Sequence, residues 1–258
     1  MGSLLFDDEY IARGIKGDYA GGGQSTLSPL DRLLLWAIKI AMALAQGIAS
    51  VICHIPVLSS FYEGFARTYS RGAAGFFLRA AYYKNRLKRM GQNVFIDVGV
   101  TIWEPGNVEI DQGCHIDTYV NILGGARGHG FVRIGKYVHV ASFCVLAGRG
   151  GIEIGDYAAI AAGSNIYSGT NYYQNPESQS NKLLCMSAAA PLDMQYVIEK
   201  PVAIGEYAFI GLDTIVLPGV TIGKAAVVGA GSMVGNDIPP FAIAVGSPAK
   251  VVKQRPQL

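Results

Sequence analysis

The sequence predicts an all-β fold, a parallel β-helix built from six-residue repeats, with a helical segment before it and one long excursion within it. Between residues 204 and 234, a β-branched aliphatic residue stands at every sixth position. Glycine follows five of these six residues, and the chain holds 33 glycines, as a fold with frequent turns requires. Neither a helix nor a flat strand has a period of six, so the pattern indicates a solenoid. The six residues are Ile204, Ile210, Val216, Ile222, Val228 and Val234.

Four regions follow one another along the chain. Residues 1–27 are polar and glycine-rich and are expected to form a loosely held arm. Residues 28–90 are predicted to be helical, the β-helix is predicted over 93–240, and residues 241–258 form a C-terminal tail. Three hexapeptides make a triangular coil of about 18 residues. The aliphatic residues should point inward, and the residues just before them should point outward.

A strong start signal opens the helical segment at Ser28-Pro29-Leu30-Asp31. Ser28 can cap the helix, Pro29 suits its first position, and Asp31 suits the positive end of its dipole. Residues 33–53 are apolar on nearly every side, and a bilayer span needs about 20 such residues. Lys39 within this stretch argues against a simple span.

The rest of the helical segment is rich in aromatic residues and ends in a basic cluster, a combination that suits a membrane surface. Two alternatives therefore stay open for residues 33–90. One is membrane association, at the inner face of the plasma membrane, and the other is burial against a neighbouring subunit.

Before residue 204 the repeat is less regular. It shifts by two residues after Val108 and again before Ile154, and it stops over residues 167–201. A long excursion within a compact domain is usually functional. We therefore expect residues 168–200 to project from one side of the solenoid.

Charge and cysteine content exclude several classes of function. Charged residues make up 16% of the chain, the net charge is +2, and the repeat carries no basic stripe, which argues against nucleic-acid binding. The four cysteines lack paired spacing, which favours reduced thiols and a cytoplasmic location. Cys114 and Cys144 occupy small-residue positions and are interpreted as lining the coil turns. The first residues include three acids, Asp7, Asp8 and Glu9, so no secretory signal is expected.

The second half of the chain, PVAIGEYAFIGLDTIVLPGVTIGKAAVVGAGSMVGNDIPPFAIAVGSPAKVVK, resembles the left-handed β-helix acyltransferases of the hexapeptide-repeat family. The resemblance extends over residues 93–253. Two blocks, IGKYVHVASFCVLAGRGGIEIGDY and IYSGTNYY, are similar to sugar acetyltransferases that serve surface polysaccharide and lipopolysaccharide synthesis. The resemblance implies a homotrimer of left-handed β-helices. It also implies acetyl-CoA bound between neighbours as co-substrate, and acetyl transfer to a hydroxyl or amine of a sugar without a metal.

Direct transfer from a thioester needs a base that takes the acceptor's proton, and histidine titrates near neutrality. Relatives such as the galactoside and maltose acetyltransferases keep this base at the start of the excursion, which here reads Ser168-Gly169-Thr170-Asn171-Tyr172-Tyr173, without histidine. The polysaccharide group keeps its histidine in a motif like YVHVA, which implies that His139 is the base. His129, and after it His115, are the alternatives.

Other residues are candidates for orienting the base, binding the acceptor or binding coenzyme A. Asn121 lies 18 positions before His139, so it is expected beneath the ring, where it would hold the imidazole or a substrate hydroxyl. Asn171 and Tyr172 are expected to line the acceptor pocket, and Asp117 and Asp156 are acidic candidates for orienting the imidazole. The resemblance assigns coenzyme A to a ledge of small residues and to two lysines: Gly211, Gly229, Ala230, Gly231, Ser232, Lys250 and Lys253. Coil turns also need these glycines.

Three other functions fit parts of the sequence. A γ-type carbonic anhydrase on the same scaffold needs three histidines with a closer spacing than that of His129 and His139. A non-catalytic trimeric scaffold would not bind coenzyme A. Acyl transfer to the amine of an amino sugar would use the same base, so the sequence does not separate it from O-acetylation.

Overall fold

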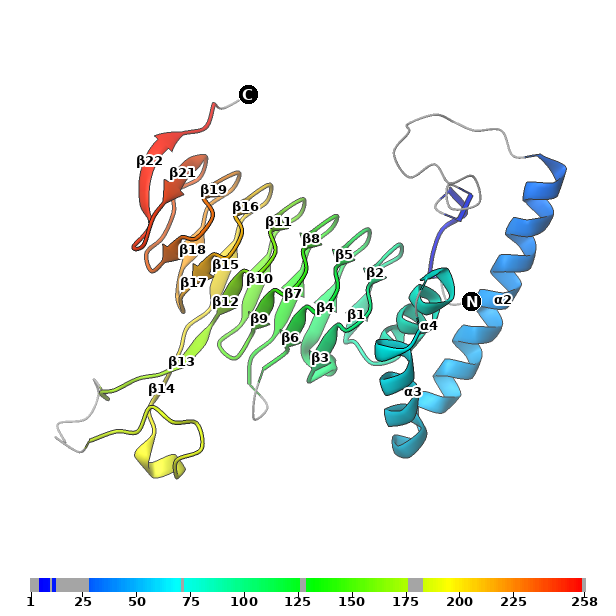
Figure 1. Ribbon diagram of the computed structural model, residues 1–258, viewed down its shortest axis with the longest axis horizontal. Helices are drawn as coiled ribbons and strands as arrows, with labels where there is room; N and C mark the ends of the chain where they lie inside the picture. Colours follow the sequence, from blue (N-terminus) through cyan, green and yellow to red (C-terminus); the bar gives the residue numbers. More distant parts are fainter. Residues whose placement is uncertain are drawn as a thin grey trace.

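The computed structural model describes residues 5–9, 11–12, 28–70, 72–125, 129–175 and 183–256. Figure 1 shows a solenoid of stacked coils with helices packed at one end and the excursion projecting from its side. The predicted parallel β-helix with a helical segment before it and one long excursion is therefore confirmed.

Each coil contributes one short strand to each of three sheets. The first sheet has the order β1 (Arg89–Met90), β4 (Val108–Ile110), β7 (Val132–Ile134), β10 (Ile152–Ile154), β15 (Val202–Ile204) and β18 (Thr221–Ile222). The second has β2 (Phe95–Ile96), β5 (His115–Ile116), β8 (His139–Val140), β11 (Ala159–Ile160), β16 (Phe209–Ile210), β19 (Val227–Val228), β21 (Ala242–Val245) and β22 (Lys250–Gln254). The third has β3 (Thr101–Trp103), β6 (Asn121–Leu123), β9 (Val145–Ala147), β12 (Asn165–Tyr167), β17 (Ile215–Val216) and β20 (Met233–Val234). The pairs are parallel except β21 with β22, which is antiparallel.

Inward and outward positions alternate as predicted. In the second sheet, Ile116, Val140, Ile160 and Ile210 stack in one row and are fully buried. Burying each such side chain contributes about 1.5–3 kcal/mol to the free energy of unfolding. The residues just before the aliphatic ones point outward, and His115, Asn121, Arg133 and His139 are exposed while Asn165 is half-buried.

The two-residue shifts of the repeat arise in the first sheet. Its three-residue strands turn two side chains inward instead of one, as Val108 and Ile110 do in β4 and Ile152 and Ile154 do in β10. Both members of each pair are buried. The shifts therefore lengthen a strand without breaking the stack.

Two of the cysteines lie inside the coils, as interpreted from the sequence. Cys114 and Cys144 are buried, and burial raises the pKa of the Cys114 thiol to about 12 and that of Cys144 to about 11. Because the thiolate is the reactive form, these two groups are poor nucleophiles at neutral pH.

The excursion projects from the solenoid as predicted (Figure 1). It leaves the third sheet after β12, and its base is a two-stranded ribbon in which β13 (Gly169–Asn171) pairs antiparallel with β14 (Val197–Glu199). A short 3₁₀ turn, η2 (Leu192–Met194), lies within it, and another, η1 (Pro105–Asn107), precedes β4.

Three helices precede the solenoid: α2 (Pro29–Cys53), α3 (Pro56–Thr68) and α4 (Gly72–Lys84). The predicted start of the first is confirmed, because the Asp31 N–H donates to Ser28 Oγ at 3.2 Å and the Ser28 N–H donates to Asp31 Oδ2 at 2.9 Å. In Figure 1, α3 and α4 lie between α2 and the first coil. The helix α2 is long and apolar enough to cross a membrane by length and composition.

The helix α4 covers the open end of the first coil. Three of its side chains donate to backbone carbonyls there: Arg79 Nε to Ile96 at 2.7 Å, Tyr83 Oη to Val100 at 3.2 Å, and Lys84 Nζ to Met90 at 2.6 Å. Arg79 and Tyr83 are buried. Arg79, Tyr83 and Lys84 thus satisfy the edge of the β-helix, whereas membrane association of residues 33–90 stays a prediction.

The described first residues of the segment 1–27 pack against the same helical end of the solenoid. Leu5 and Phe6 are buried, and the Phe6 ring lies 5.5 Å from that of Phe77 and 5.4 Å from that of Phe95. The polar composition of residues 1–27 gave no sign of this anchor. Residues 13–27 lie outside the described part of the chain.

The C-terminal residues cover the other end. The first sheet ends where the Gly223 N–H donates to the Ile238 carbonyl, and the second ends in β22. In the third sheet, the Met233 N–H donates to the Gly246 carbonyl, and the Met233 carbonyl accepts the Ala249 N–H. The sheets thus extend on both sides of residues 93–240, into β1 at one end and into β21 and β22 at the other.

Candidate functional site

His139 lies outward on the second sheet and makes a hydrogen-bond contact with a carboxylate. Its Nε2 is 3.0 Å from Oδ2 of Asp117, which directly follows β5 in the preceding coil. The His139 side chain is 50% exposed and that of Asp117 is 29% exposed, so solvent and substrate can reach the pair. An ionised carboxylate only accepts hydrogen bonds, so Nε2 carries the proton and Nδ1 keeps its lone pair. The arrangement is that of an oriented general base.

A second histidine lies beneath the first. His115 occupies the same register position one coil earlier, and the two rings are 5.9 Å apart with a tilt of 42°. On its other side, His115 meets the Phe95 ring at 4.9 Å. Partial burial between these rings lowers the pKa of His115, an effect that Asp117 opposes. His115 is thus a neutral neighbour of the pair at physiological pH.

The predicted position of Asn121 beneath His139 is wrong. His115 and His139 pair although they are 24 residues apart, because the longer loop between β6 and β7 adds four residues to this coil and the two-residue shift at β7 adds two more. Asn121 lies on the third sheet, beside Val145. Asp156, the other acidic candidate, accepts the Lys136 N–H at 2.7 Å on a different corner. Only Asp117 of these three contacts the His139 ring among the described hydrogen bonds.

The remaining catalytic and acceptor candidates belong to other parts of the solenoid. His129 is exposed in the loop that joins the third sheet to the first, and its neighbours 126–128 lie outside the described residues. Asn171 donates from Nδ2 to the Met186 carbonyl at 2.8 Å within the excursion. The Tyr172 ring contacts that of Tyr173 at 4.5 Å, and its hydrogen bond with Tyr173 raises the pKa of Tyr172. Within one chain these residues do not contact the His139–Asp117 pair in any described interaction, and their roles stay predictions.

The small residues assigned to coenzyme A lie near the far end of the second sheet. Gly211 and Gly229 directly follow β16 and β19. A Cβ on Gly211 would come within 2.5 Å of the Ala230 nitrogen, so stacking of the coils itself requires glycine there. Gly231 has a φ of +67° at a corner with open space around it. Ser232 is buried, and its hydroxyl donates to the Gly229 carbonyl at 2.6 Å.

One column of outward residues connects the histidines with the predicted lysines. From His139 it continues along the second sheet through Ala159, Phe209, Val227 and Ile243 and ends at Lys253 on β22. Five strand spacings of about 4.8 Å give it a length of about 24 Å. The column is apolar between a base at one end and two exposed lysines, Lys250 and Lys253, at the other.

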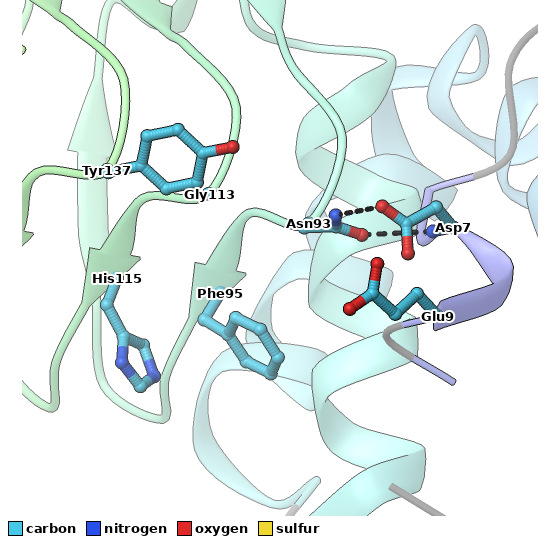
Figure 2. A pocket seen from close by; sticks show the side chains of 7 residues that line it. All are labelled: Asp7, Glu9, Asn93, Phe95, Gly113, His115 and Tyr137. Carbon is cyan, nitrogen blue, oxygen red and sulfur yellow. Dashed lines mark hydrogen bonds between the residues drawn. The ribbon is translucent and has the colours of Figure 1, made fainter. Parts of the chain in front are cut away.

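A cavity of about 490 Å³ opens beside His115, on the side of the helices. Figure 2 shows that the His115 and Phe95 side chains point the same way from neighbouring strands. It also shows Asp7 held by Asn93, whose Nδ2 donates to Asp7 Oδ2 at 2.6 Å and whose Oδ1 accepts the Asp7 N–H at 3.0 Å. With Glu9, this gives the cavity an acidic wall at the β2 edge of the sheet, on the side away from His139.

Among the described residues, no group of three histidine, cysteine or acidic side chains gathers in a way that could hold a metal ion.

Comparison with known proteins adds to this geometry. Residues 201–236 match the family model described as the hexapeptide repeat of succinyl-transferase. The dTDP-4-amino-4,6-dideoxy-D-glucose acyltransferase of Escherichia coli is 32% identical over 168 residues, which cover 65% of this chain and 82% of that protein.

Two solved structures share the fold. AntD, an N-acyltransferase from Bacillus cereus in complex with dTDP and 3-hydroxybutyryl-CoA, is 26% identical, covers 74% of this chain and 90% of its own, and has a TM-score of 0.60. A maltose O-acetyltransferase from Clostridium difficile 630 is 22% identical, covers 80% of this chain and 89% of its own, and has a TM-score of 0.52. The second likeness concerns the fold alone.

Proposed function

This chain belongs to the hexapeptide-repeat acyltransferase family, and on that premise we propose that it transfers an acetyl group from acetyl-CoA to a sugar hydroxyl, with His139 as general base. The acceptor class is a precursor of surface polysaccharide or lipopolysaccharide, modified in the cytoplasm. The observation that carries the proposal is the exposed His139–Asp117 pair, at 3.0 Å, on the sheet that also bears the coenzyme A candidates.

The proposed reaction is a single displacement. His139 Nδ1 takes the proton of the acceptor hydroxyl while its oxygen attacks the thioester carbonyl. Collapse of the tetrahedral intermediate breaks the carbon–sulfur bond, and the imidazolium returns the proton to the leaving thiolate of coenzyme A. Asp117 holds the ring and stabilises the imidazolium. A base of this kind contributes a factor of about 10²–10⁴ in rate.

The proposed course of coenzyme A follows the outward column of the second sheet. Its thiol end would lie near His139, the pantetheine arm would cross Ala159 and Phe209, and Lys250 and Lys253 would meet the phosphates as charge-assisted donors. The column of about 24 Å matches an extended coenzyme A in scale. AntD, which was solved with an acyl-CoA, supports this choice of co-substrate.

In this proposal the working unit is a homotrimer, and the excursion of one subunit brings Asn171 and Tyr172 to the acceptor of the next. Support comes from the excursion, which projects away from its own solenoid (Figure 1). The exposed apolar side chains near the coenzyme A column, Leu212 and Ile215 among them, are suited to the side of a neighbouring solenoid.

A second candidate is transfer to the amine of a nucleotide-linked amino sugar. It is favoured by the names of the Escherichia coli relative and of AntD, both acyltransferases of that type. The His139–Asp117 pair argues for a hydroxyl acceptor, because an alcohol becomes a good nucleophile only as it loses its proton. A sugar amine is already partly unprotonated near neutral pH.

The two candidates are separated by a matched pair of acceptors. Purified protein is given acetyl-CoA and either a dTDP-sugar or the same dTDP-sugar with an amine in place of one hydroxyl, and thiol release is followed. The proposal expects release with the hydroxyl acceptor and a product whose acetyl group is removed by mild alkali. An alkali-stable amide would establish N-transfer instead. If neither acceptor is acetylated and calorimetry detects no coenzyme A binding, both transfer reactions are rejected and a non-catalytic scaffold is favoured.

A further inference from the structure

The outer side of the helical end is apolar and exposed. Along α2, a stripe at helical spacing consists of Leu33, Trp36, Leu44, Ile48 and Val51, and Phe61 of α3 extends it. We call these six residues the outer apolar face. Trp36 is 62% exposed, Leu44 63% and Phe61 74%, although such side chains are ordinarily kept from water. A face of this size indicates an interaction surface.

The opposite side of α2 is committed to the protein. Met42, Ala49 and Cys53 are buried, and α2 contacts both α3 and α4. Lys39, the one charged residue in the stretch 33–53, is paired with Asp8 at 2.7 Å. Because α2 packs on the protein through its second half, at Met42, Ala49 and Cys53, and its Lys39 is paired with Asp8, the helix is placed to lie on a bilayer rather than to cross it.

The charges around the face distinguish a lipid surface from a second copy of the chain. Arg32 is exposed at the start of α2, and Arg86 is exposed near Cys53 at its end. Glu63 of α3 accepts the Tyr82 hydroxyl at 3.0 Å, and Asp31 is used by the helix cap. The two acids keep their charge, but the helical segment 28–90 as a whole holds nine lysines and arginines against these two acids. A second copy would bring two segments of the same positive charge together, whereas anionic headgroups compensate that charge.

We propose that the outer apolar face docks on an anionic lipid bilayer, with α2 parallel to the membrane plane and the solenoid extending away from it. Trp36 and Phe61 would lie at headgroup depth, where aromatic rings are favoured. Figure 1 shows that the solenoid departs from the helical end on the side away from α2, so the second sheet stays open to the solution.

The first test is vesicle flotation with the full chain. Vesicles of phosphatidylcholine and phosphatidylglycerol are compared with vesicles of phosphatidylcholine alone. Wild-type protein is expected to float with the anionic vesicles and less with the neutral ones. The double variant Leu44→Glu/Ile48→Glu should reduce bound protein by more than about tenfold, because each apolar side chain that leaves water contributes about that factor. Leu183→Glu is the matched control, since Leu183 is 85% exposed on the excursion and should not matter.

The second test uses the two tryptophans as native probes. In Trp103→Phe, the fluorescence of Trp36 should shift to the blue on anionic vesicles and be quenched by brominated lipid. In Trp36→Phe, the shift should disappear.

Two results would overturn the proposal. One is wild-type protein that stays soluble with every vesicle composition. The other is a mass by light scattering that falls in Leu44→Glu/Ile48→Glu without any vesicle binding by the wild type, because a second copy then covers the face. Acetyl transfer to a soluble acceptor should be unaffected by this double variant, so failure of the membrane proposal is distinguishable from failure of the proposed function.

Discussion

The early and late coils of the second sheet have similar interiors but different surfaces. At β5 and β8 the buried residues are Ile116 and Val140, and at β16 and β19 they are Ile210 and Val228. Outside, the early strands carry His115 and His139, whereas the late ones carry Phe209 and Val227. The late coils follow the six-residue period without interruption, and the early ones contain shifts and a loop. Inward positions thus define the fold, and outward positions on the irregular coils carry the residues proposed for catalysis.

The sharpest way to test this division is to remove the outward imidazole. His139→Ala should lower the turnover by about 10²–10⁴. Oligomeric mass and calorimetric coenzyme A binding should stay as in the wild type, because the side chain lies outside the core. Near wild-type turnover would contradict the assignment, and a comparable loss in His129→Ala would move the base to the loop after β6.

The converse test truncates a buried side chain of the solenoid core. Ile160 is fully buried in β11, so Ile160→Ala should lower the free energy of unfolding by about 2–5 kcal/mol. Ala159, one residue earlier, points outward, and Ala159→Ser should change it by less than about 0.5 kcal/mol. Urea unfolding of both variants gives the comparison. Equal losses would break the distinction between inward and outward positions.

The carboxylate beneath the base should matter less than the base itself. Asp117→Asn keeps the shape of the side chain but removes the charge that stabilises the imidazolium, so turnover should fall by roughly 10–10³. The KM for acetyl-CoA should change little, since Asp117 lies far from the late coils. A raised KM with unchanged kcat would show that Asp117 serves binding instead.

The smallest effect is a pH dependence of stability. In the folded chain the pKa of His115 lies below its ordinary value of 6.5, because partial burial disfavours the charged ring. The unfolded chain then binds the proton more readily, so this contribution is present above pH 6.5 and is lost as the pH falls through the lowered folded pKa. His115→Gln should flatten the fall between pH 7.5 and 5.5 by less than about 0.5 kcal/mol, since solvent screens the exposed part of the ring. Urea unfolding at the two pH values measures it, and an unchanged slope would contradict it.

The sequence predicts the solenoid well because its period is a direct record of which residues point inward. The same period predicted the outward position of His139, which the structure shows, while its role as base came from a family motif and stays a prediction. Its neighbours were not, because stacking depends on the length of every intervening loop. A coil of 24 residues instead of 18 replaces Asn121 with His115 beneath the ring and leaves Asp117 within reach of Nε2.

The helical segment illustrates the opposite limit. Aromatic and basic residues have the same composition whether they face lipid or satisfy a sheet edge. Arg79, Tyr83 and Lys84 donate to backbone carbonyls of the first coil, whereas the residues of the outer apolar face on α2 and α3 are exposed. Composition identifies the segment, but it does not determine which way each side chain points.

The two covered ends of the solenoid have a consequence for solubility. A stack of parallel strands can in principle add further chains at either edge, which is how cross-β fibrils grow. Here α4 covers one terminus, and at the other the parallel stack ends in the antiparallel strand β22 and in residues 246–249. Removal of α4 should therefore expose unpaired strand edges and favour association of chains at that end.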